Sequence, residues 1–247
     1  MTHKKIRLLI AAAVLAGGAP VHAAWQFDTE TGIVSNGYND VKIPGDTGTL
    51  FSLSNDLNIK NAVFFRETIT RQLTDKSSLA LLIAPLTLQA DGKLAAPVNF
   101  SGTLFPANTD VDASYTFNSY RLSYRYLVHQ TDKLESAIGF TAKIRDAAIK
   151  VKGGGLSAEK TNVGLVPLLY FRVQWNATPK AGLLLEGDAL AAPQGRAEDI
   201  LLAARYALSG RATLKAGYRI VEGGADNKEV YNFALLNYAV IGITFTY

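Results

Sequence analysis

The chain has 247 residues, of which 48% are hydrophobic, 19% are charged and none is cysteine. The lack of cysteine excludes a disulfide framework and a thiolate metal site. Its formal net charge of +4 includes Lys4, Lys5 and Arg7 of an N-terminal leader, so the remaining chain is nearly neutral. The charge therefore gives no electrostatic reason to expect nucleic acid as a partner.

The first 23 residues have the order of charge, apolar run and small residues that is typical of a cleaved signal peptide. The basic residues precede an apolar stretch from Leu8 to Leu15, which is too short to cross a bilayer as a helix. Small residues follow in Val21-His22-Ala23-Ala24. We therefore predict that residues 1–23 are a signal peptide cleaved after Ala23, so that the mature chain begins near Ala24 and is exported.

After the leader, apolar residues recur with a period of two rather than the 3.6 of a helix. In the segment 162–176, one face is apolar and the other carries Arg172 and Gln174. The apolar face consists of Val163, Leu165, Pro167, Leu169, Phe171, Val173 and Trp175. Because only helices and closed barrels satisfy every backbone hydrogen bond in hydrocarbon, this alternation predicts an all-β transmembrane barrel.

Connections of two lengths alternate along the chain, as in bacterial barrels, which have short periplasmic turns and longer extracellular loops. The short connections are 73–76, 129–133, 178–180 and 209–210, and the long ones are 90–113, 152–161, 190–198 and 223–229. This spacing predicts a closed antiparallel barrel of ten strands, with eight and twelve as alternatives, and both ends in the periplasm. The predicted strands are 48–57, 61–72, 77–89, 114–128, 134–151, 162–176, 181–189, 199–208, 211–223 and 230–247.

Two segments do not fit this scheme. Residues 24–47 show no clear period, so we predict a periplasmic lead-in or a plug there and place the transmembrane barrel at 48–247. Arg66 and Glu67 are adjacent, so one of them would face lipid unless a bulge or the barrel rim intervenes.

The last six residues resemble the β-signal by which outer-membrane barrels are recognised for assembly. Gly242 lies five residues before the terminal Tyr247, and Phe245 lies two before it, although Val240 and Tyr247 replace the more usual polar residue and Phe. The resemblance implies the superfamily of Gram-negative outer-membrane β-barrels, located in the cell outer membrane. It also implies the barrel assembly machinery, outer-membrane lipid and lipopolysaccharide as partners, but no particular activity.

The enzymes of this superfamily, the omptin proteases and the lipid A deacylases and palmitoyltransferases, use a histidine, and beyond the leader the chain has only His129. His129 lies in a predicted periplasmic turn, away from the outer surface. The carboxylate pairs Asp110/Asp112 and Glu186/Asp188 suit a cation or acid–base chemistry, but solvated loops and lumen ion pairs explain them more simply. We therefore expect no enzyme, cofactor or metal.

The inward faces of the predicted strands carry about two basic side chains for each acidic one. The predicted lumen-lining residues are Arg121, Arg125, Lys143, Arg145, Arg172, Glu186, Asp188, Asp199, Arg205, Lys215 and Arg219, with Glu135 also facing inward. This set predicts a narrow, anion-leaning pore for a small solute of unknown identity. The alternative is a non-conducting structural or surface-interaction barrel that acts through its extracellular loops, because a ten-strand lumen is narrow enough for ion pairs to close.

Overall fold

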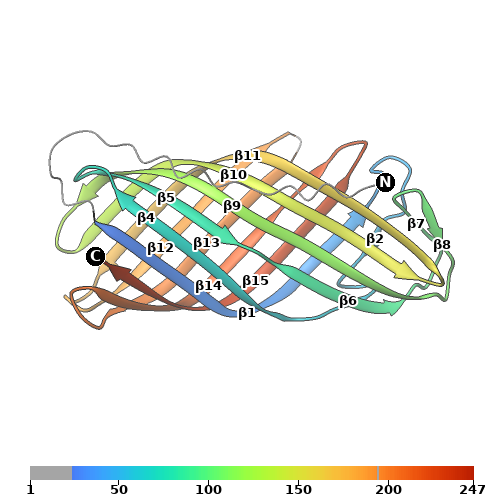
Figure 1. Cartoon of the computed structure of the whole chain (residues 1–247), viewed down its shortest axis with the longest axis horizontal. Helices are drawn as coiled ribbons and strands as arrows, with labels where there is room; N and C mark the ends of the chain where they lie inside the picture. Colours follow the sequence, from blue (N-terminus) through green and yellow to red (C-terminus); the bar gives the residue numbers. More distant parts are fainter. Residues whose placement is uncertain (1–23, 194) are drawn as a thin grey trace.

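The computed structural model describes residues 24–193 and 195–247, which form a closed antiparallel barrel (Figure 1). The predicted signal peptide, 1–23, lies outside the described residues. The wall strands are β1 (Trp25–Lys42), β4 (Ala62–Gln72), β5 (Ser77–Ala84) continued by β6 (Thr87–Lys93), β9 (Asp110–Gln130), β10 (Leu134–Gly153), β11 (Leu156–Asn176), β12 (Ala181–Ala192), β13 (Gly195–Ala207), β14 (Ala212–Asp226) and β15 (Tyr231–Thr246). Pairing of β15 with β1 closes the barrel, and the predicted all-β class and strand number of ten are confirmed.

No helix formed by the described residues is long and apolar enough to cross a bilayer.

The two ends of the barrel differ in the length of the segments that connect the strands there (Figure 1). Four short turns connect strands at the end where Trp25 and Tyr247 lie, and we call it the turn end. At the opposite end, the loop end, segments 43–61 and 94–109 connect β1 to β4 and β6 to β9. These segments contain the short strands β2 (Phe51–Ser52), β3 (Asn58–Ile59), β7 (Val98–Phe100) and β8 (Thr103–Phe105).

The prediction of a lead-in or plug at 24–47 is wrong, because β1 is the first wall strand. It pairs with β15 on one side and with β4 on the other. Its period is obscured by a bulge between Asn36 and Tyr38, and by Thr29 and Thr31 on its outward face. The barrel therefore begins at Trp25 rather than at residue 48.

The predicted strand 48–57 is likewise wrong. Apart from β2 and β3, segment 43–61 runs as turns over the loop end. Phe51, Leu53 and Leu57 are buried there in the barrel interior. The apolar residues that suggested a membrane strand are thus explained by burial inside the mouth of the barrel.

Three of the predicted long loops, 152–161, 190–198 and 223–229, are mostly strand. The hairpin between β10 and β11 turns at Gly154 and Gly155, whose φ angles of 58° and 78° favour glycine. Polar outward residues such as Lys152 and Glu159 lie on strands that continue beyond the apolar part of the wall.

The middle of the wall is covered by exposed apolar side chains, which we call the apolar band. Its most exposed members include Val63, Phe140, Leu165, Leu169, Leu202 and Ile241. Toward the loop end the outward residues become polar, with Asn118 donating to Asp146 at 3.1 Å across β9 and β10. The band is the surface expected to face lipid.

Arg66 and Glu67 occupy regular strand without a bulge at this position, so they face opposite sides. Arg66 is buried inside the barrel, whereas Glu67 lies on the outward face, where Thr29 Oγ1 donates to its carboxylate at 2.5 Å. Glu67 is the middle of the five outward positions of β4, from Val63 to Arg71. A carboxyl group is therefore present within the apolar band.

Replacing Leu169 by Arg tests the placement of the apolar band. Leu169 is 51% exposed and pairs with Phe140 and Ala189 in the middle of the wall. Burying a guanidinium in hydrocarbon there should lower the free energy of unfolding by about 2–4 kcal/mol, measured by urea unfolding in lipid vesicles. Thr161→Arg, on the same face beyond the band, is the control; equal effects of the two changes would contradict this placement.

Candidate functional site

A buried aspartate, Asp199 on β13, lies at the centre of the barrel interior. Its side chain is 2% exposed. Arg66 from β4 donates to it at 2.9 Å, Arg121 from β9 at 2.6 Å, and Arg219 from the adjacent β14 completes the set. Because β4 and β9 lie across the lumen from β13, these contacts join nearly opposite walls.

The ion pairs continue around the same level of the barrel. Arg121 also donates to Asp188 of β12 at 2.8 Å, and Arg219 donates to both oxygens of Glu30 of β1 at 2.8 Å. Arg66 Nε lies 3.5 Å from Glu30. We call the six side chains Glu30, Arg66, Arg121, Asp188, Asp199 and Arg219 the charged layer.

The six side chains of the charged layer comprise three carboxylates and three guanidinium groups, and the buried Lys215 also donates to Glu30 at 2.5 Å. Each of the six residues is buried. Removing a single buried charge is costly because its partners then lose compensation in a medium of low polarity. The ion pairs thus join side chains across the lumen.

The loop half of the interior, beyond the charged layer, is an apolar core. Phe64 and Tyr238 pack edge to face with ring centroids 4.9 Å apart; Phe64 lies two residues before Arg66 on β4, and Tyr238 pairs with Arg219 across β14 and β15. Side chains from segments 43–61 and 94–109, among them Leu53, Phe100 and Phe105, are fully buried. The charged layer and this core together separate two cavities.

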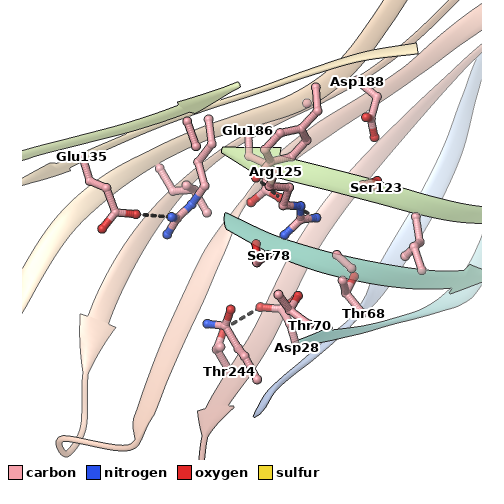
Figure 2. Close-up of a pocket in the computed structure, with 18 of the residues that line it drawn as sticks. Asp28, Thr68, Thr70, Ser78, Ser123, Arg125, Glu135, Glu186, Asp188 and Thr244 are labelled. Carbon is pink, nitrogen blue, oxygen red and sulfur yellow. Dashed lines mark hydrogen bonds and ion pairs between the residues drawn. The ribbon is translucent and has the colours of Figure 1, made fainter. Parts of the chain in front are cut away.

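The cavity on the turn side, which we call the lower cavity, has a volume of about 300 Å³ and is mainly polar. Figure 2 shows Asp28, Arg125, Glu135 and Glu186 directed into it from different strands. Arg125 lies 3.4 Å from Glu186 and stacks over the ring of Tyr170. Ion pairs therefore line this cavity as well as closing it.

Every predicted lumen-lining residue borders one of the two cavities. Nine border the lower cavity, namely Arg121, Arg125, Arg172, Glu186, Asp188, Asp199, Arg205, Lys215 and Arg219. Arg172 pairs there with Glu135, and Lys215 donates to Asp28 at 2.6 Å. Lys143 and Arg145 border the other cavity, which we call the upper cavity.

Asp28, Glu30 and Arg66 were not predicted as lumen residues, and they change the charge balance. With them, eight basic and seven acidic side chains line the lower cavity, so the expected excess of two basic groups to one is wrong. The first two lie on β1, whose assignment to a lead-in removed both carboxylates from the prediction. In the sequence, the aromatic residues Trp25 and Phe27 alternate with Asp28 and Glu30, and this pattern indicates that the two carboxylates face the lumen.

The other candidate groups are widely separated. His129 is exposed near the turn-side end of β9, whereas Asp110 and Asp112 are exposed at its loop-side start. Of the other carboxylate pair, Glu186 faces Arg125, and Asp188 belongs to the charged layer. These positions do not bring His129 and the paired carboxylates into one site.

The predicted assembly signal lies on β15 at the turn end. Phe245 and Tyr247 are exposed on the outward face, and the Tyr247 ring packs edge to face against Phe27 at 6.0 Å. Gly242 lies beside the Lys215 side chain, which leaves little room for a larger residue. Recognition by the assembly machinery remains a prediction.

Comparison with known proteins identifies the fold. No protein-family profile and no curated protein matches the chain. Among solved structures, the outer membrane protease OmpT from Escherichia coli is 10% identical, with a TM-score of 0.50 and coverage of 91% of this chain and 97% of that one.

Two further matches are an outer membrane channel from Pseudomonas putida F1 and Ail, the attachment invasion locus protein of Yersinia pestis. The channel is 11% identical, with a TM-score of 0.44 and coverage of 93% and 97%. Ail is 9% identical, with a TM-score of 0.42 and coverage of 90% and 99%. The likeness to OmpT shows that the chain has the fold of bacterial outer-membrane barrels, and a shared fold by itself shows no activity.

Changing Asp199 to Asn tests the charged layer. The variant keeps the shape of the side chain but leaves three buried guanidinium groups facing a neutral amide. We expect the free energy of unfolding to fall by about 3–5 kcal/mol, measured in lipid vesicles. Glu198→Gln, the next residue on β13, is the matched control, because Glu198 lies outside the charged layer. A loss no larger in Asp199→Asn than in this control would show that the layer contributes little.

Proposed function

We propose that this chain is a non-conducting outer-membrane barrel that acts at the cell surface through its loop end. The observation that carries the proposal is the bridge from Arg121 on β9 to Asp199 and Asp188 on the facing strands. These side chains are at most 11% exposed, so ions have no wide aqueous path past them. The apolar core on the loop side adds a second barrier, because an ion would lose its hydration there.

The loop end offers a rigid surface for contacts outside the membrane. Arg196 donates to both oxygens of Glu222 at 2.8 Å and stacks over the ring of Phe233 at 4.9 Å. Tyr38 from β1 binds the same carboxylate. An ordered cluster of charged and aromatic side chains is suited to binding a partner or ligand.

Segments 43–61 and 94–109 brace each other at this end. Ser101 N donates to Ile43 O at 2.8 Å, and Thr49 N donates to Asn99 O at 2.9 Å. The same segments contribute to the apolar core, so the surface that they present is held by packing inside the barrel. In this proposal outer-membrane lipid and lipopolysaccharide surround the apolar band, and the barrel assembly machinery inserts the chain.

The competing function is a narrow, anion-leaning pore. It is favoured by the basic side chains of the lower cavity, Arg125, Arg172 and Arg205, near the turn end. Conduction would require the charged layer and the apolar core to rearrange. A pore of this kind would lose or reverse its anion preference in the double variant Arg172→Gln, Arg205→Gln.

Single-channel recording in planar bilayers separates the two functions. We expect the purified, folded barrel to give no conductance steps above leak, because the charged layer and the apolar core close the lumen. A wide-pore porin reconstituted in the same way serves as the positive control. Reproducible steps with an anion preference that falls in the double variant would overturn the proposal in favour of the pore.

A further inference from the structure

On the loop side of Leu169, the described residues of β11 and β12 are not paired, and we call this unpaired stretch of the wall the opening. β11 pairs with β10 from Leu156 to Trp175, but with β12 only from Leu169 to Asn176. The loop-side half of β11 therefore has a paired strand on one side alone among the described residues. Pro167 lies at the start of this unpaired edge and has no N–H to donate to a neighbour.

The upper cavity extends into this opening. Leu165 and Pro167, on the outward face of β11, border the cavity together with Val166, which alternates with them on the inward face. Leu190 and Ala192 of β12 border it from the other side. The unpaired ends of β11 and β12 therefore border the cavity together.

The opening lies at the loop-side border of the apolar band. Leu165 pairs with Ile144, the last apolar outward residue of β10 before Asp146. Leu165 itself is 73% exposed. With the loop end outside the cell, this is the level of the outer leaflet, where an acyl chain meets its polar head.

A buried cation forms the floor of the cavity. Lys143 is 3% exposed, and its ammonium lies 4.7 Å from the centroid of the Phe117 ring. Neither an ion pair nor a hydrogen bond engages this ammonium within the described part of the chain. A buried ammonium without a carboxylate is costly, so a bound anion would stabilise it.

The rest of the lining combines positive charge with apolar surface. Arg145 and Lys160 border the cavity beside Tyr115 and Ile149. The carboxylates on its border, Glu222 and Glu229, come from the opposite wall, and Glu222 is already paired with Arg196. The volume, about 420 Å³, is within the range of small-molecule sites.

We propose that the upper cavity binds a long-chain fatty acid. The carboxylate pairs with Lys143 and Arg145, and the acyl chain leaves through the opening between β11 and β12 into the outer leaflet. This inference goes beyond the proposed surface function and shares with it only the separation of the two cavities.

Binding of parinaric acid, a fluorescent long-chain fatty acid, to the full barrel in lipid nanodiscs tests the inference. Oleate should displace it, whereas oleyl alcohol, which lacks the charge, should compete at least about tenfold more weakly, since a hydrogen bond to a charged group contributes about 1.5–3 kcal/mol. Butyrate should not displace it. Equal competition by oleate and the alcohol would overturn the assignment of an anion site.

Two pairs of variants locate the ligand. Lys143→Met should weaken binding at least about tenfold, while Lys143→Arg restores it and Lys152→Met, on the outward face of β10, leaves it unchanged. Leu190→Trp should block the opening, whereas Ala191→Trp, which is not part of the cavity lining, should not. Unchanged binding of the fatty acid by both Lys143→Met and Leu190→Trp would contradict the proposal.

Folding is checked for every variant by its resistance to unfolding on unheated gels. Conductance is recorded on the same preparations. Absent binding with absent conductance contradicts this inference alone, whereas conductance contradicts the proposed function whether or not the fatty acid binds.

Discussion

The burial of Asp199 among three arginines is the constraint on which the rest of the interior depends. A carboxylate that is 2% exposed is stable only when cations surround it, and Arg66, Arg121 and Arg219 reach it from three strands. Their remaining hydrogen-bonding groups then recruit Glu30 and Asp188. One buried charge thus explains why six strands are tied together at a single level of the barrel.

This level divides the interior into two chemically different halves. On the turn side, charged and hydroxyl side chains line a cavity that opens toward the turns, while on the loop side segments 43–61 and 94–109 fill the barrel with apolar side chains. The upper cavity lies beside that core and is bordered by the unpaired ends of β11 and β12. In the function that we propose, the loop end holds a ligand or a partner, and solutes do not pass along the axis.

Strand alternation predicted the class and nine of the ten wall strands, because a period of two is visible wherever one face is apolar and the other charged. It failed for β1, where a bulge and outward threonines interrupt the period, and for 48–57, where apolar residues face the interior. The missing β1 also concealed Asp28 and Glu30. Which arginine meets which carboxylate depends on barrel register and shear, and local sequence patterns do not encode these quantities.

Sided labelling of single cysteines tests most directly whether the lumen is divided, since the chain contains no cysteine of its own. Thr68→Cys places a thiol in the lower cavity, and Ala147→Cys places one in the upper cavity. In vesicles that hold the barrel in one orientation, a charged, membrane-impermeant thiol reagent should modify the lower-cavity cysteine only from the turn side and the upper-cavity cysteine only from the loop side. Modification of either cysteine at equal rates from both sides would contradict a closed lumen.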